Sequence, residues 1–242
     1  MRVNLSLFKQ FIDLLIPLRC AKCGIILENS HGLCATCWTL IPFITSPYCK
    51  CCGLPFEFEI EEGALCGACS HTHPPYKIAR SVFVYTPQSR DLILKFKHTD
   101  SIHSAPLFAE WMARLLEDIE NPLCIPVPLH WTRLFMRTYN QAGLLAYEIA
   151  KHRGWAYDPS LLIRKRRTPS QGHLSKKERI KNIEGAFIIP ERKKKGLLGK
   201  TVVLVDDVFT TGATLNACSK ALLKAGAKEL HALTLGRVVK SY

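Results

Sequence analysis

Acidic residues are scarce in this 242-residue chain: 20 Asp and Glu stand against 33 Lys and Arg, which gives a formal net charge of +13. A surplus of this size favours polyanionic partners such as nucleic acid, anionic membrane or phosphorylated ligands. Long apolar runs are also missing, since no stretch approaches the roughly 18 apolar residues that a membrane span requires. The sequence therefore predicts no membrane span, although an apolar content of 48% is ample for a folded core.

A secretory signal is lacking as well. The first residues, MRVNLSLFKQFIDLLIPLRC, have no small-residue cleavage site and carry Lys9 and Asp13, which argues against a signal peptide. Their apolar side chains recur at helical spacing, which predicts a short amphipathic helix packed on the protein. We therefore expect a cytoplasmic protein, in which disulfides are disfavoured.

A nucleotide-binding P-loop is the third absence. The stretch GLLGKT at 196–201 contains Gly-Lys-Thr, but Lys194 stands where a P-loop needs its first glycine. The stretch also precedes a predicted strand, whereas a P-loop follows one. We interpret it as a turn.

Cysteine is abundant by contrast, and its spacing predicts a metal module. Of the eleven cysteines, eight form four Cys-x-x-Cys pairs in the first third of the chain. Two residues between thiolates allow a tight turn that places both sulfurs on one ion, and repeated pairs of this kind are typical of tetrahedral zinc. Ligation by sulfur alone closes the coordination sphere, so we expect one or two structural zinc ions. The predicted ligands are Cys20, Cys23, Cys34, Cys37, Cys49, Cys52, Cys66 and Cys69.

The pairing of these ligands stays open in the sequence. The simplest arrangement places the first two pairs on one zinc and the last two on another, as a double zinc ribbon over residues 1–75, but a cross-braced arrangement is also compatible. Cys51 could replace a neighbour, and His71 or His73 could compete with Cys69. Two prolines at 74–75 mark the boundary to a second predicted domain, 76–242.

The second domain alternates between strand and helix patterns. We predict clear strands at 78–85, 124–128, 201–205 and 229–235, less distinct strands at 161–166 and 186–190, and helices at 104–119, 140–154 and 214–226. Strands separated by single helices indicate an α/β fold with a mostly parallel sheet, flanking helices and right-handed crossovers.

The stretch VVLVDDVFTTGATL, 202–215, predicts the functional site. A buried strand runs into Asp206 and Asp207 and then through hydroxyl residues and a glycine into a helix. Ligands of parallel sheets bind beyond the carboxyl ends of strands, and the unpaired amides of a helix start attract phosphate. The two acids suit ribose hydroxyls or a divalent cation. The stretch therefore predicts a site for a ribose 5-phosphate.

The same stretch resembles the phosphoribosyl pyrophosphate (PRPP) motif of type I phosphoribosyltransferases. Together with PVPLHWTRLFMRTYNQAGLLA at 126–146, RRTPSQGHLSKKERIKNIEGAF at 166–187 and the cysteine pairs, it resembles the ComF family of competence and DNA utilisation proteins. The resemblance covers essentially the whole chain. It implies a phosphoribosyltransferase-like domain behind a double zinc ribbon, with Mg²⁺ and PRPP as ligands.

The resemblance also implies roles for individual residues. Asp206 and Asp207 would hold ribose hydroxyls or magnesium, and they are the catalytic candidates. The 5-phosphate loop would comprise Thr210, Thr211, Gly212, Ala213 and Thr214. The loop around 129–137, with Arg137, corresponds to the pyrophosphate-binding loop. Thr138 and Tyr139 depart from the Gly-Phe that is common in the family before Asn-Gln.

A basic segment, 164–182, corresponds to the mobile loop of true transferases. It carries a single acid, Glu178, among many cations, which can clamp a pyrophosphate or follow a nucleic-acid backbone. The cations that we single out are Arg164, Lys165, Arg166, Arg167, Lys176, Lys177 and Arg179.

Two functions remain open at this level. In the first, the chain binds PRPP with Mg²⁺ and also single-stranded DNA, and acts in DNA uptake (natural transformation) or in the use of external DNA, with uptake or recombination proteins as partners. In the second, it is an active PRPP-dependent phosphoribosyltransferase, similar to an amidophosphoribosyltransferase, with an unidentified small-molecule acceptor. The family resemblance and the basic surplus favour the first.

Overall fold

The structure is a computed structural model that describes residues 18–27, 32–97, 99–116, 119–129, 139–166, 183 and 185–239. The predicted N-terminal amphipathic helix lies outside these residues. Within them, no helix is both long and apolar enough to cross a membrane.

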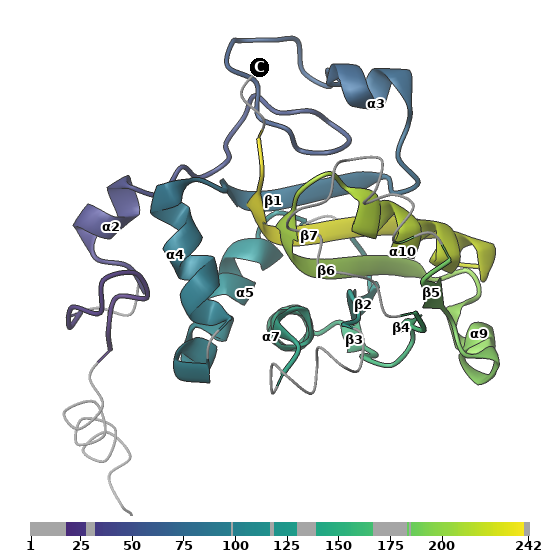
Figure 1. Cartoon of the computed structure of the whole chain (residues 1–242). Coiled ribbons are helices and arrows are strands. Elements are labelled where there is room, and N and C mark those ends of the chain that lie inside the picture. Colours follow the sequence, from purple (N-terminus) through teal and green to yellow (C-terminus); the bar gives the residue numbers. More distant parts are fainter. Residues whose placement is uncertain are drawn as a thin grey trace, which may run out of the picture.

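A five-stranded sheet forms the centre of the second domain (Figure 1). Its strand order is β1-β7-β6-β2-β3, and every neighbouring pair is parallel. The strands are β1 (Ile78–Val84), β2 (Leu123–Pro126), β3 (Ala156–Tyr157), β6 (Thr201–Phe209) and β7 (Glu229–Arg237). The prediction of a mostly parallel sheet is confirmed.

Strand β6 lies at the middle of the sheet because its aliphatic residues are buried on both faces. Val202 and Leu204 contribute to a core with helix α10 (Ala213–Lys224). Val203 and Val205 contribute to a second core with helices α4 (Pro87–Phe96), α5 (Ala105–Ala113) and α7 (Gln141–Arg153). The alternation of these side chains thus builds three layers, with helices on both faces of the sheet.

Several predicted elements change length in the structure. The helix expected at 104–119 spans nine residues as α5, after a 3₁₀ turn η1 (Thr99–Ser104). The strand expected at 229–235 continues to Arg237 as β7. The strands expected at 161–166 and 186–190 shrink to β4 (Ile163–Arg164) and β5 (Phe187–Ile188), which form a separate antiparallel pair.

The stretch GLLGKT is a turn, as predicted. Helix α9 (Glu191–Leu197) ends before it, and Gly199, at φ +68°, donates its amide to the carbonyl of Gly226 at 2.9 Å. Strand β6 then begins at Thr201.

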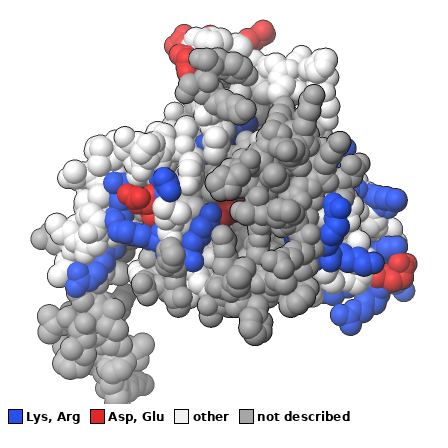
Figure 2. Space-filling view, viewed as in Figure 1, with Lys and Arg blue, Asp and Glu red and all other residues white. Residues whose placement is uncertain are grey.

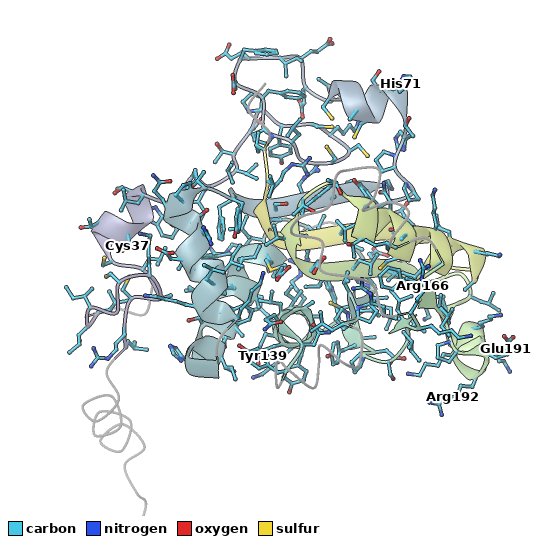
Figure 3. The ribbon with its side chains drawn as sticks, in the orientation of Figure 1. Cys37, His71, Tyr139, Arg166, Glu191 and Arg192 are labelled. Carbon is cyan, nitrogen blue, oxygen red and sulfur yellow. The ribbon has the colours of Figure 1, made fainter. Side chains whose placement is uncertain are left out.

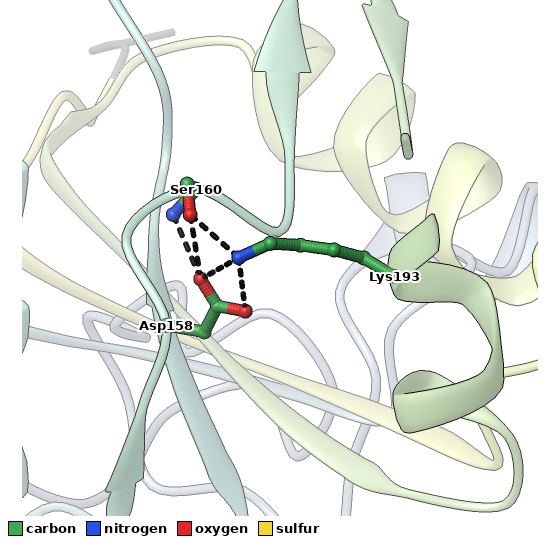
Figure 4. Close-up of polar contacts among 3 residues, drawn as sticks. All are labelled: Asp158, Ser160 and Lys193. Atoms are coloured by element: carbon green, nitrogen blue, oxygen red, sulfur yellow. Dashed lines mark hydrogen bonds and ion pairs between the residues drawn. The ribbon is translucent and has the colours of Figure 1, made fainter. Parts of the chain in front are cut away.

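A small polar cluster fixes α9 to the loop after β3 (Figure 4). Lys193 Nζ lies 2.6 and 2.7 Å from the two carboxylate oxygens of Asp158 and 2.5 Å from Ser160 Oγ. Burial by itself would raise the pKa of Asp158, but the hydrogen bonds from Lys193 and Ser160 outweigh it and hold that pKa below its ordinary value. Lys193 is therefore engaged in a structural ion pair.

The cysteine-rich region packs against both faces of the sheet. Cys20 of the first pair and Cys37, on helix α2 (Ala35–Thr39), belong to the core of α4, α5 and α7. Cys49 and Cys69, the latter on helix α3 (Gly67–His71), belong to the core of α10. The segment between the two halves runs along β1, where the amide of Ile44 donates to Val82 O and the amide of Val84 donates to Pro42 O, each at 2.9 Å. This pairing covers the edge of the sheet.

Candidate functional site

The first two Cys-x-x-Cys pairs form one tetrad. The sulfurs of Cys20, Cys23, Cys34 and Cys37 all lie within 4.8 Å of one another, and the Sγ atoms of Cys23 and Cys34 are 3.7 Å apart. After the first pair the chain turns at Gly24, which has a φ of +79° and donates its amide to Cys20 O at 2.8 Å. Only glycine adopts this left-handed conformation without strain.

The last two pairs form the second tetrad, of Cys49, Cys52, Cys66 and Cys69. The Sγ atoms of Cys52 and Cys66 are 3.6 Å apart. The amides of Cys52 and Cys66 donate to Cys49 Sγ at 3.5 and 3.3 Å. The hydrogen bond from the Cys52 thiol, assisted by these amides, lowers the pKa of Cys49 and so favours the thiolate, the form that binds metals.

Both tetrads fit zinc. In a tetrahedral site with Zn–S bonds of about 2.3 Å, neighbouring sulfurs lie about 3.8 Å apart, close to the distances of 3.7 and 3.6 Å. The grouping is the simple pairing and not the cross-braced one. Among the described residues, neither group includes Cys51, His71 or His73; His71 lies on α3 and Cys37 on α2 (Figure 3).

The acid pair lies at the carboxyl end of β6. Asp206 is paired with Thr234 in the ladder to β7, and its Oδ1 accepts the amide of Asp207 at 2.9 Å. Asp207 Oδ2 lies 2.9 Å from Lys97 Nζ. Burial, followed by the negative charge of Asp207, raises the pKa of Asp206 to about 8, while Lys97 and Arg164 oppose the rise. Near neutral pH the pair of carboxyl groups therefore retains one proton. A divalent cation bound beside the two carboxylates would favour loss of that proton.

Arg164 lies beneath the site and not on its surface. It forms half of β4 with an exposed fraction of 7%, and its guanidinium lies 5.6 Å from the ring centroid of Phe187. Its charge is close enough to Asp206 to lower the pKa of that carboxyl. Lys165 and Arg166, the next cations of the predicted basic segment, are exposed. Its other cations, Arg167, Lys176, Lys177 and Arg179, lie outside the described residues, as does Arg137.

The predicted phosphate loop leads directly into α10. Gly212, at φ +75°, is the N-cap of α10, and its carbonyl accepts the amide of Asn216 at 2.8 Å. A Cβ at this position would lie 2.8 Å from the Phe209 ring, so both the backbone angle and the space require glycine. Ala213 and Thr214 form the first turn, whose amides have no acceptor within the helix. Thr210 and Thr211 lie between the acids and this turn.

Among the described residues, Lys97 contacts the acid pair although the sequence did not reveal it as a site residue. It caps the C-terminus of α4, and the start of α7 holds it in place. The hydroxyl of Tyr139 donates to Phe96 O at 2.6 Å, and Gln141 Nε2 donates to Lys97 O at 3.4 Å. Tyr139, which Figure 3 shows beside α7, is thus half-buried and tied to the backbone.

Comparison with known proteins agrees with both halves of the structure. The family described as "Double zinc ribbon domain" matches residues 11–70, and that described as "Phosphoribosyl transferase domain" matches residues 143–239. A DNA utilization protein YhgH of Salmonella typhimurium is 32% identical over 234 residues, which are 93% of this chain and 100% of that protein. Competence protein F of Haemophilus influenzae is 31% identical over 90% of this chain and 96% of its own length.

The chain belongs to the ComF family. Competence protein ComFC of Streptococcus pneumoniae is a more partial match, 30% identical over 65% of this chain and 67% of that protein. A solved glutamine PRPP amidotransferase from B. subtilis aligns with 59% of this chain and 30% of its own at 22% identity, with a TM-score of 0.40, which is too weak a likeness to carry an inference. Membership confirms the family resemblance, and with the parallel sheet it confirms the predicted fold class.

Loss of one cysteine from the second tetrad is expected to lower the metal content of the chain. Two tetrads predict about two zinc ions per chain in the unaltered protein. Cys69→Ser is expected to reduce this to about one, measured by elemental mass spectrometry. Cys51→Ser is the matched control and retains both ions, because Cys51 belongs to neither group. Iron in place of zinc, or equal losses in the two variants, would contradict the assignment.

Replacing Asp206 is expected to stabilise the ligand-free fold. The folded pKa of Asp206, about 8, lies above the ordinary 3.8, so wild-type stability falls as the pH rises from the lower value to the higher. In the absence of divalent cations, Asp206→Asn should change the Tm little near pH 3.8 and raise it by roughly 3–6 °C above pH 8. Scanning calorimetry across this pH range measures the difference. Asp207→Asn removes the second cause of the raised pKa of Asp206 but also breaks the ion pair with Lys97, so its gain above the higher pKa should be smaller than that of Asp206→Asn. A gain in Asp206→Asn that does not vary with pH would refute the explanation.

Proposed function

We propose that the chain binds PRPP or a related ribose phosphate with Mg²⁺, that it also binds single-stranded DNA, and that it acts in DNA uptake or in the use of external DNA. One observation carries the ligand: Asp206 and Asp207 lie near the carboxyl end of the central strand β6, shortly before a helix start at which both the backbone angle and the space beside Phe209 require glycine. The names of its relatives, competence protein F and DNA utilization protein, support the biological role.

Each end of the site suits a different part of the ligand. The first-turn amides of α10, with the hydroxyls of Thr210, Thr211 and Thr214, suit the 5-phosphate. The carboxylates of Asp206 and Asp207 suit ribose hydroxyls, and hard oxygen donors of this kind also suit Mg²⁺, which would neutralise charge on the phosphates. We assign Arg137 to the pyrophosphate end on the family resemblance.

The charge distribution supports a nucleic-acid partner at the second domain. Figure 2 shows acidic side chains at the end of the molecule that the second ribbon forms. The exposed segment 57–62 of this ribbon contains Glu57, Glu59, Glu61 and Glu62. That segment repels a phosphate backbone. Lys165 and Arg166 continue from β4, whose Arg164 adjoins the acid pair, so a strand bound there would run beside the ribose phosphate site. We propose the same role for Arg167, Lys176, Lys177 and Arg179.

A second function, pentosyl transfer from PRPP to a small acceptor, is favoured by the cations around the acids. Lys97 lies 2.9 Å from Asp207, and the charge of Arg164 acts on Asp206. Fixed positive charges in such a position can stabilise a departing pyrophosphate. Release of pyrophosphate from PRPP by the purified chain, on addition of a base or an amine, would establish this activity.

The acid pair is expected to determine PRPP affinity. Asp206→Asn with Asp207→Asn removes two charged acceptors and should weaken PRPP·Mg²⁺ binding at least about 100-fold, as measured by titration calorimetry. Gly212→Ala, which strains the phosphate loop, should weaken it at least about tenfold. Glu191→Gln, an exposed acid of α9, controls for loss of negative charge and should bind as wild type. Undiminished affinity in the double variant would remove the acids from the site.

The exposed cations after β4 are expected to contribute to DNA binding. Lys165→Gln with Arg166→Gln should weaken binding of a labelled single-stranded oligonucleotide in fluorescence anisotropy. Two lost phosphate contacts should also reduce the slope of log K against log salt concentration by about 1.4. Arg192→Gln with Lys195→Gln removes the same charge from α9, where Figure 3 shows Arg192 at the outer end, and should leave the slope unchanged. Equal effects of the two pairs would show that only net charge matters.

A further inference from the structure

The second cysteine tetrad and the phosphate loop lie against the same buried arginine. Arg237 ends β7 with an exposed fraction of 6%. Its Nη1 donates to Cys52 O at 2.6 Å, and its Nη2 donates to Cys52 Sγ at 3.3 Å. Figure 1 shows the chain rising from β7 into the loops that precede α3, so the end of this strand enters the second ribbon.

On its other side, Arg237 supports the loop. Its guanidinium carbon lies 4.1 Å from the ring centroid of Phe209, a cation–π contact. The backbones of the two residues are paired in the β6–β7 ladder, and Val238 N donates to Phe209 O at 2.8 Å. The Phe209 ring is in turn the surface against which Gly212 lies, at a distance that leaves no room for a Cβ. A continuous set of contacts therefore runs from Cys52 through Arg237 and Phe209 to the N-cap of α10.

The charge of Arg237 requires a partner. A buried guanidinium is costly unless an opposite charge compensates for it, yet no carboxylate among the described residues forms an ion pair with it. Four thiolates around one divalent metal ion carry a net negative charge. A loaded tetrad of Cys49, Cys52, Cys66 and Cys69 supplies the missing compensation, through the sulfur that Arg237 already contacts.

We propose that Arg237 is a positioning residue that couples metal occupancy of the second tetrad to the order of the phosphate loop. When the tetrad is loaded, its negative charge holds the guanidinium in place, and the guanidinium holds the Phe209 ring under Gly212. When the metal is lost, Arg237 loses its counter-charge, and the support of the loop weakens. The part of this inference that concerns ligand affinity rests on the proposed ribose phosphate site; the part that concerns loop order does not.

Two matched cysteine variants test the coupling. Cys66→Ser breaks the second tetrad without touching Arg237, and Cys23→Ser breaks the first. Hydrogen exchange of the peptide 208–216, followed by mass spectrometry on the full-length chain, should become at least about tenfold faster in Cys66→Ser. Exchange should be unchanged in Cys23→Ser, and peptides from α7 should be unaffected in both. Equal exchange of the loop in Cys66→Ser and the unaltered chain would overturn the proposal.

Variants of Arg237 separate the coupling from metal binding itself. Arg237→Met with both tetrads loaded should show fast loop exchange, and adding Cys66→Ser should increase it no further. If Arg237→Met fails to fold, Arg237→Lys, which keeps the charge but loses the planar contact with Phe209, should show the same effect to a smaller degree. Arg80→Met is the control, since Arg80 stacks on Tyr48 of the ribbon and donates to Ala79 O. Loop exchange that is as fast in Arg80→Met as in Arg237→Met would overturn the proposal.

Calorimetry with ribose 5-phosphate distinguishes this inference from the proposed function. The affinity should fall about tenfold in Arg237→Met and in Cys66→Ser, and not in Cys23→Ser. If the unaltered chain does not bind ribose 5-phosphate while loop exchange responds as described, the proposed ligand is wrong and the coupling stands. If it binds and the loop exchange does not respond, the coupling is wrong and the ligand stands.

Discussion

The arrangement of the second domain follows from two carboxylates held at the end of a buried central strand. Because β6 lies between β2 and β7, Asp206 is only partly exposed to water, and burial favours its protonated form. The cations that moderate this cost come from separate elements, Lys97 from the end of α4 and Arg164 from β4. Each of those elements is in turn fixed by other contacts, the first by Tyr139 and Gln141 and the second by its pairing with β5. The site and its supports are therefore parts of one packing arrangement.

The sequence was informative where chemistry is local. Cysteine spacing, the aliphatic run of β6 and the glycine before α10 each depend on neighbours within a few residues, and the structure contains two cysteine tetrads, the buried strand β6 and a helix that begins after Gly212. Lys97 could not be predicted, because its contact with Asp207 depends on how α4 packs against the sheet. Arg164 was expected in a basic segment that clamps a pyrophosphate or follows a nucleic-acid backbone, yet it is buried, while the adjacent Ile163 is 42% exposed. In this two-residue strand the charged side chain is therefore buried and the apolar one exposed. The contact of Arg164 with the Phe187 ring and the nearby charge of Asp206 account for this arrangement.

The glycine of the phosphate loop shows why a motif needs more than its own residues. Its backbone angle is local, but the surface that excludes a side chain there is the Phe209 ring. That ring packs edge-on against Tyr76, with centroids 6.4 Å apart, and against Arg237. The start of α10 is thus supported by residues from the boundary of the cysteine-rich region and from the last strand of the sheet. Conformation at the proposed phosphate loop therefore depends on residues far apart in the sequence, Tyr76 and Arg237.

The two cysteine tetrads belong to opposite cores of the same sheet, the first with α4, α5 and α7 and the second with α10. The segment that joins them covers the β1 edge. The predicted boundary at residue 75 therefore does not separate two independently packed units. A chain cut there would lose the cysteine-rich part of each core and the segment that is hydrogen-bonded along the edge strand β1. The surfaces of the sheet are therefore shaped to receive the cysteine-rich region. Exchange of that region between relatives would require compensating changes on both faces of the sheet.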